Sequence, residues 1–191
     1  MEFWIIVGII IVIAIIYEAR KSSSSSVGGG SSMDLMSAVL KLEQGDESAL
    51  KVIESHAIKK NQNQDLACAS LGEYYRYKNE KTSASWFLKG AKLGNMGCQS
   101  EMSAIYKEGI GVPQDEKKAF EMMKLSADNP NPSTLADKQA IFCTTVGAAY
   151  LAGAGVKKDK KKAKEYFQKG CDKGDQAGCD ALENFDQLSN E

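Results

Sequence analysis

Residues able to perform catalysis are few in this chain. Its 191 residues include one histidine, His56, which excludes any site that needs two. No cysteine or carboxylate lies beside His56 at a metal-ligand spacing, so we expect no metal site. Ser48 and Lys51 form the S-x-x-K of penicillin-recognising enzymes, but S-D-N and K-T-G are absent and Lys81-Thr82-Ser83 matches only in part. We therefore expect no catalytic residues, no cofactor and no small-molecule substrate.

Lysine concentrates near the C-terminal end, with eight residues between Lys157 and Lys173. Such a block could contact anionic lipid. The simpler interpretation is a solvated helix surface with Asp159, Glu165 and Asp172 as local partners. Because the block has no arginine and no aromatic pattern suited to base stacking, and the net charge of the chain is −1, we expect no nucleic acid partner.

The lysine block lies within a segment that we expect to be helical, because small and large apolar residues recur at helical spacing between residues 142 and 182. A first helix is followed by a glycine turn, and a second helix ends before Gly174. The residues that define this helix–turn–helix unit are Val146, Gly147, Tyr150, Gly153, Gly155, Ala163, Tyr166 and Phe167.

The same unit occurs twice more. Upstream by 44 residues stand Met102, Ser103, Tyr106, Gly109, Gly111, Ala119 and Met123. A third, shorter copy has Leu71, Gly72, Tyr75, Trp86, Phe87 and Ala91, with Lys78–Lys81 in place of the glycine turn. Such self-similarity is typical of stacked hairpins that bury one another's apolar faces. It predicts an all-α chain of αα-hairpin repeats forming a short right-handed solenoid, with the repeated aromatic residues in its core.

The repeated residues resemble the Sel1-like repeat family, relatives of the tetratricopeptide repeat. The series from Gly153-x-Gly155-Val156-x-x-Asp159 to Gly174-Asp175 carries most of the family pattern, and the resemblance covers residues 66 to about 182. It departs where the first repeat lacks its glycine turn and where 128–133 are inserted after the second. The resemblance implies an adaptor that binds proteins or peptides, often in membrane-associated complexes, rather than an enzyme.

Composition divides the chain into an apolar segment, a linker and a helical domain. We expect an N-terminal membrane anchor over 1–21, a Ser/Gly linker over 22–32 and a repeat domain over 33–191. Within the domain, repeats are expected at 66–94, 97–128 and 140–174. Helical caps are expected at 33–60 and 175–190, giving about nine helices in all.

The anchor prediction depends on residues 3–17, an uninterrupted apolar run without charge. As a helix the run is roughly 22 Å long, short for a hydrocarbon core of about 30 Å. A cleaved signal peptide is the alternative, but Glu2 precedes the run and no A-x-A-like site follows. Arg20 and Lys21 follow it, so the positive-inside rule favours an inner-membrane, single-pass protein whose repeat domain faces the cytoplasm.

The five cysteines allow two interpretations. Cys68, Cys143 and Cys179 share one repeat position with Gln99, where a buried free thiol packs as a small hydrophobe. Alternatively, Cys171 and Cys179 are near enough across the Gly174 turn to bridge, as in the cysteine-rich secreted branch that the chain resembles. A disulfide needs an oxidising compartment, whereas the charges beside the apolar run favour the reducing cytoplasm. We follow the charges and expect the cytoplasmic side.

A partner is expected on the concave face formed by the first helices. The tetratricopeptide positions that point into such a groove correspond here to Glu73, Arg76, Tyr77, Ser100, Ala104, Lys107, Thr144, Ala148 and Leu151. Mixed charge with some apolar groups suits an extended peptide or a partner helix. We thus predict a membrane-tethered adaptor. The alternatives are a periplasmic or secreted cysteine-stapled protein with hydrolase-like activity on β-lactam or cell-wall compounds, and an immunity-type protein that neutralises one partner.

Overall fold

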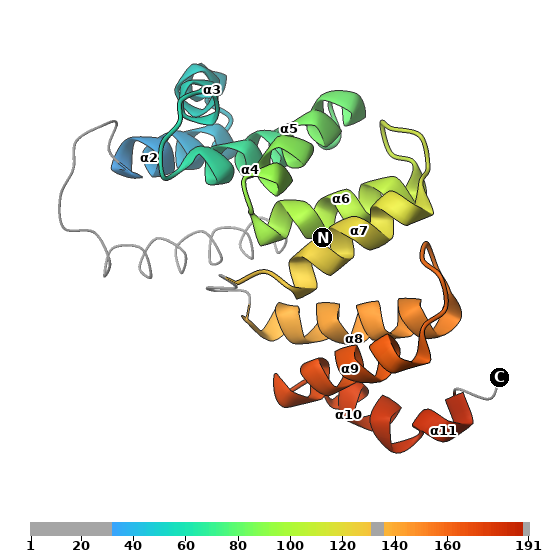
Figure 1. The fold of residues 1–191 in the computed structure, drawn as a ribbon. Helices are drawn as coiled ribbons and strands as arrows, with labels where there is room; N and C mark the ends of the chain where they lie inside the picture. The colour runs from blue at the N-terminus through green and yellow to red at the C-terminus, as the bar shows by residue number, and fades with distance from the viewer. Residues whose placement is uncertain (1–31, 131–135, 189–191) are drawn as a thin grey trace.

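The computed structural model describes residues 32–130 and 136–188, and within these ranges every regular element is helical (Figure 1). This confirms the all-α prediction. The elements are α2 (Ser32–Glu43), η1 (Glu47–Ala49), α3 (Leu50–Ile58), α4 (Gln64–Tyr75), α5 (Glu80–Lys92), α6 (Met96–Glu108), α7 (Glu116–Ala127), α8 (Ala136–Ala152), α9 (Lys160–Asp172), α10 (Gln176–Glu183) and α11 (Phe185–Leu188).

The helices pair into three hairpins, α4/α5, α6/α7 and α8/α9, and each hairpin packs against the next one along the chain. At the N-terminal end, α2 and α3 pack before α4, and α10 packs on α9 at the other end. The buried residues form three successive clusters rather than one central core. Packing of each hairpin against the next is the defining property of a solenoid, so this arrangement confirms the predicted stack of αα-hairpin repeats.

The second helix of each hairpin begins at the same kind of cap. Asn79, Asp115 and Asp159 each accept a hydrogen bond from the backbone N–H three residues later, at 2.9 to 3.0 Å. These bonds satisfy donors that a helix leaves unpaired in its first turn. The cap therefore fixes the start of the helix in every repeat, including the first, which lacks the glycine turn.

The glycine turns are required by the stacking of successive repeats. Gly111 and Gly155 have φ of 68° and 67°, a conformation that disfavours other residues. A side chain at Gly111 would strike the backbone of Glu80, and one at Gly155 would strike the carbonyl of Glu116. Each turn thus lies against the first residue of the preceding repeat's second helix, which leaves no room for a Cβ atom.

Small residues also let the two helices of a hairpin approach closely. A Cβ atom at Gly72 would overlap the ring of Phe87, and one at Gly147 would overlap the ring of Phe167. The aromatic residues expected in the core are buried at Tyr106, Tyr150 and Phe167. Those of the first repeat, Tyr75 and Trp86, are only partly buried against the N-terminal cluster.

The ends of the array differ in part from expectation. The C-terminal cap expected over 175–190 consists of two helices within the described residues, because α10 ends at Glu183 and α11 begins at Phe185. His56 packs in α3 with 6% of its surface exposed. The predicted anchor over 1–21 and the 22–32 linker up to residue 31 lie outside the described residues. Among the described residues, no helix has the length and apolar character to cross a membrane.

Candidate protein-binding surface

The first helices of the three hairpins each leave one stripe of residues exposed or half-buried. The stripes occupy equivalent repeat positions, because residues four, seven and eleven apart lie on one side of a helix. We call them together the first-helix face: Leu66, Ser70, Glu73 and Tyr77 on and just after α4, Gly97, Glu101, Ala104 and Glu108 on α6, and Ile141, Thr145, Ala148 and Ala152 on α8.

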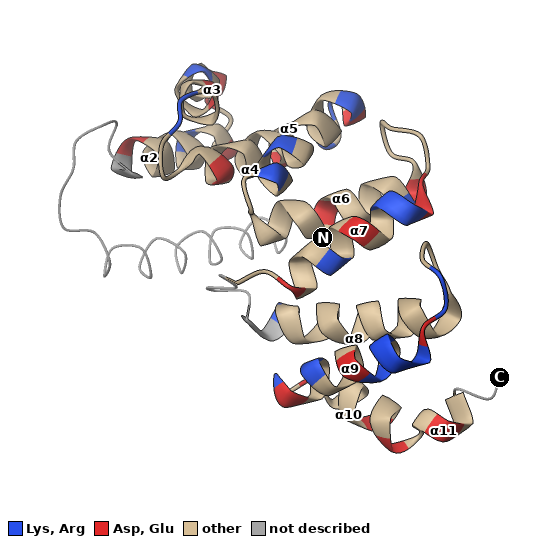
Figure 2. Cartoon of the chain, viewed as in Figure 1, with Lys and Arg blue, Asp and Glu red and all other residues tan. Residues whose placement is uncertain are grey.

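The α8 part of the first-helix face has no charge. Residues 139–156 contain no Asp, Glu, Lys or Arg, and Figure 2 shows α8 in tan beyond its first residues. Ile141 is 54% exposed and stands with Thr145 and Ala148 on one stripe. An exposed aliphatic side chain within an uncharged stripe can be buried by a partner without desolvating an ion.

The α4 and α6 parts are charged and joined by one guanidinium group. Arg76 Nη2 lies 2.7 Å from Glu73 Oε2 and 2.8 Å from Glu101 Oε2, so it links α4 to α6. Its guanidinium also lies over the Phe87 ring, 5.2 Å from the centroid. Burial alone would lower the pKa of Arg76, but the hydrogen bonds with Glu73 and Glu101 raise it above its usual value. Arg76 therefore positions the two carboxylates rather than standing free for a partner.

The other residues predicted for the concave face are either exposed or half-buried. Tyr77 is 91% exposed and Lys107 is exposed, while Ser100 is half-buried. Thr144 is half-buried as well: its Oγ1 donates to the Ala140 carbonyl at 3.4 Å and lies where Cβ atoms on Gly170 or Gly178 would fall. It therefore packs at the junction of α8, α9 and α10.

The neighbouring residue Thr145, which was not predicted, is exposed. The helical spacing fixed the set of candidates, but a shift of one residue turns a side chain by about 100° around the helix. Glu101 and Ile141 were not predicted from the sequence either. The repeat pattern could have identified both. Glu101 occupies the repeat position of Thr145, and Ile141 lies four residues before Thr145 on the same side of α8.

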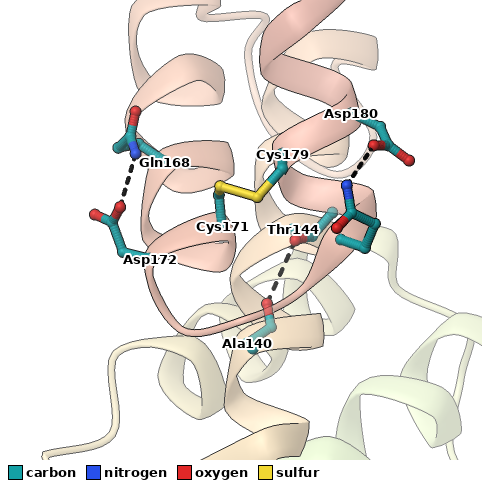
Figure 3. The surroundings of a disulfide bond; sticks show 8 residues. Ala140, Thr144, Gln168, Cys171, Asp172, Cys179 and Asp180 are labelled. Carbon is teal, nitrogen blue, oxygen red and sulfur yellow. Dashed lines mark hydrogen bonds between the residues drawn. A yellow bond between two sulfur atoms is a disulfide. The ribbon is translucent and has the colours of Figure 1, made fainter.

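Cys171 in α9 and Cys179 in α10 are joined by a disulfide, with their Cα atoms 4.7 Å apart (Figure 3). The interpretation of Cys179 as a buried free thiol is therefore wrong. The bond spans the turn at Gly174, whose φ of 94° reverses the chain between the two helices. It attaches the C-terminal cap covalently to the last repeat.

The remaining cysteines, Cys68, Cys98 and Cys143, are free and buried, as the simpler interpretation predicted for two of them. Burial raises the pKa of the Cys68 thiol to about 11 and also raises those of Cys98 and Cys143. Protonated thiols are poor nucleophiles and poor metal ligands. Within the ranges described, no group of His, Cys, Asp and Glu could hold a metal ion.

The S-x-x-K sequence has no catalytic arrangement around it. Ser48 donates its hydroxyl hydrogen to Asp46 Oδ1, and its backbone N–H bonds to the same oxygen at 3.0 Å. Asp46 thereby caps η1, which is the ordinary role of such a residue before a short helix. The observed bonds make Ser48 part of a helix start rather than a nucleophile.

The family follows from the repeats themselves. The sequence profile of the Sel1 repeat matches residues 65–95, 97–131 and 145–175, which is half of the chain. The chain belongs to the Sel1 repeat family. Sel1 repeat proteins generally mediate protein–protein interactions, and their fold is generally a non-enzymatic scaffold. Comparison with curated proteins gives no significant match.

Solved structures agree with this fold. A Sel1 repeat protein from Oxalobacter formigenes superposes with a TM-score of 0.62 at 19% identity, covering 80% of this chain and 61% of that one. The protective antigen c5321 of uropathogenic Escherichia coli gives 0.52 at 21%, covering 80% and 36%. Helicobacter pylori cysteine rich protein B gives 0.50 at 22%, covering 81% and 100%. The chain thus spans 61% and 36% of the first two, and these identities establish the fold alone.

Proposed function

We propose that this Sel1 repeat protein is a membrane-tethered adaptor that binds a peptide or protein segment on the first-helix face. The observation that carries the proposal is the division of that face into an uncharged α8 stripe and a charged α4/α6 region. A partner segment with apolar residues at one end and charged residues at the other would match both parts. Tyr77, which is 91% exposed, adds an aromatic contact of the kind enriched at interfaces.

A pair of matched variants tests the binding face. Ile141→Asp places a charge on the uncharged stripe, and Leu125→Asp places the same charge on α7 at a residue that is 48% exposed. Both positions are exposed, so we expect both variants to fold. We expect Ile141→Asp to weaken partner capture by the full-length chain at least about tenfold, as loss of a central contact does.

The capture is measured by photo-crosslinking in cells from a reactive residue at Ala148, compared with one at Leu125. Capture from position 148 that Ile141→Asp reduces and Leu125→Asp leaves intact supports the proposal. Equal losses in the two variants, or crosslinks from position 125 alone, would place the partner elsewhere and refute it.

The tether in this proposal is the apolar run at 3–17, and the charges of Arg20 and Lys21 support a cytoplasmic array. A second candidate is the same array on the oxidising side of the membrane. The bond between Cys171 and Cys179 favours it, because disulfides persist in oxidising compartments and are rare in the cytosol.

The redox state of the pair in intact cells decides between the two sides. Cells are quenched in acid, denatured and alkylated before and after reduction, and each cysteine is quantified by mass spectrometry. Alkylation of Cys171 and Cys179 before reduction, to the same extent as Cys143, supports the cytoplasmic side. Alkylation of that pair only after reduction would overturn the cytoplasmic assignment and support the second candidate.

A further inference from the structure

Six lysines lie within eight residues where the chain enters α9. With Asp159 they give residues 157–164 a formal charge of +5, so the rest of the chain, whose total is −1, carries −6. Figure 2 shows their blue band on the loop before α9 and on its first turns. All six side chains are exposed, and we call them the lysine patch: Lys157, Lys158, Lys160, Lys161, Lys162 and Lys164.

We propose that the lysine patch binds an anionic lipid surface and, together with the tether, holds the array at the membrane. Few of its charges are satisfied within the protein. Lys162 Nζ lies 3.7 Å from Asp159, and Lys164 Nζ lies over the Phe185 ring at 5.6 Å from the centroid. Lys157, Lys158, Lys160 and Lys161 make no ion pair with any residue that the structure describes.

The requirements of the fold do not explain the patch. The equivalent helices α5 and α7 open with Glu80 and Glu116, as the positive end of the helix dipole favours. In contrast, α9 opens with three consecutive lysines and has no acidic residue in its first turn. Cations at this end of a helix interact unfavourably with its dipole, so these lysines lower the stability of α9. Departures from a local rule of this kind are typical of functional positions.

Several features favour lipid over other polyanions. The patch has no arginine for bidentate phosphate recognition and no aromatic residue for base stacking, whereas flexible lysines suit a fluid layer of headgroups. The same chain carries the apolar run at 3–17, so the inference rests on the proposed tether. A tether raises the local concentration of a surface and makes weak contacts effective.

The two attachment points lie at opposite ends of the array. The tether joins the domain at α2, whereas the lysine patch begins at the turn between α8 and α9 (Figure 1). Attachment at both ends would lay the solenoid along the bilayer rather than let it extend away from it. Electrostatic contact of this kind weakens as salt shortens the screening length.

The experiment uses the full chain in nanodiscs of phosphatidylcholine alone or mixed equally with phosphatidylglycerol. A neutral dye on Ala154→Cys, an exposed residue beside the patch, reports proximity by energy transfer to a labelled lipid. We expect higher transfer in the anionic discs, with the difference lost in high salt. Each lysine held at an anionic surface strengthens binding roughly fivefold. The variant with Gln at 157, 158, 160 and 161 should therefore lose the difference.

A matched control carries four Lys→Gln changes at Lys41, Lys51, Lys59 and Lys60, which are exposed residues of the N-terminal cap. The control should keep the difference between the two discs. Equal transfer in the two discs, or equal loss in both variants, overturns the proposal and leaves an acidic protein surface as the candidate partner.

Failure of the tether is seen separately, as a chain that does not co-purify with nanodiscs of either composition. In that event the same chain is sedimented with anionic vesicles. Sedimentation that depends on the four patch lysines supports the lipid contact on its own, and sedimentation that does not depend on them overturns it.

Discussion

Removing the bond between Cys171 and Cys179 should loosen the C-terminal end of the array and leave the other end unchanged. The bond closes a loop with a sequence separation of 8, for which chain entropy gives about 2.5 kcal/mol of stabilisation. Its loss should destabilise α10 and the packing of Phe185, whose ring centroid lies 6.3 Å from that of Phe167. Because each unit contacts only its neighbours, the effect should remain close to α9 and α10.

Amide hydrogen exchange measures this local effect directly. In the double variant Cys171→Ser, Cys179→Ser, a loss of about 2.5 kcal/mol corresponds to roughly 70-fold faster exchange in α10. Helix α4, at the other end of the repeats, should exchange at its original rate. The unsubstituted chain treated with a reductant should behave as the variant does, and the variant should not respond to reductant.

An α10 whose exchange changes less than about twofold on reduction would refute this reasoning. It would mean that packing of the cap, rather than the loop closure of the disulfide, keeps α10 in place. Faster exchange throughout the array would contradict it in another way, since the repeats would then open as one cooperative unit.

Three further outcomes are expected. Gly155→Ala should lower the unfolding free energy by at least about 2 kcal/mol in urea titrations, because it adds a clash to an unfavourable φ, whereas Gly174→Ala, with open space around it, should cost less. Tyr166→Phe should cost roughly 1.5 kcal/mol at pH 7, because it removes the 2.6 Å hydrogen bond that the hydroxyl donates to Asp128. Burial would raise the pKa of Asp128, but Lys124 and Tyr166 hold it below its usual value, so its stabilisation is present above about pH 4 and lost as the pH falls further. The cost of Tyr166→Phe should therefore shrink at pH 3, and an equal cost at both pH values would contradict the assignment. Lys160→Glu should raise stability in thermal melts by about 0.5 kcal/mol, because it puts an acid in the first turn of α9, while it weakens attachment to anionic discs.

The turns and helix caps could be predicted because each depends on residues within a single repeat. Gly153 and Gly155 mark the turn before α9, and both have a positive φ. Asp159 marks the N-cap of α9 and accepts the capping hydrogen bond. The helical cap over 175–190 was predicted without its division into α10 and α11, because residues 179–188 contain no glycine or proline to mark a break. Phe185, the first residue after the division, is buried in the last cluster.

The candidate face was predictable as a set of helical positions but not residue by residue. Thr144 and Thr145 are adjacent and chemically identical, so only the packing of Thr144 against Gly170 and Gly178 shows that Thr144 is half-buried while Thr145 is exposed. The role of Arg76 depends on Glu101, which is 25 residues away and belongs to another repeat. No pattern within one repeat identifies such a partner.

By itself, the sequence determined the helices, the turns and the stacked architecture, because periodicity, caps and glycine turns act over a few neighbouring residues. Only the tertiary structure decided which side chains the repeats enclose and which they leave open. It also decided that Cys179 pairs with Cys171 while Cys143, at the same repeat position, stays free. The reason is physical: equivalent positions become different once each repeat meets a neighbour of its own, and those contacts depend on how the hairpins stack.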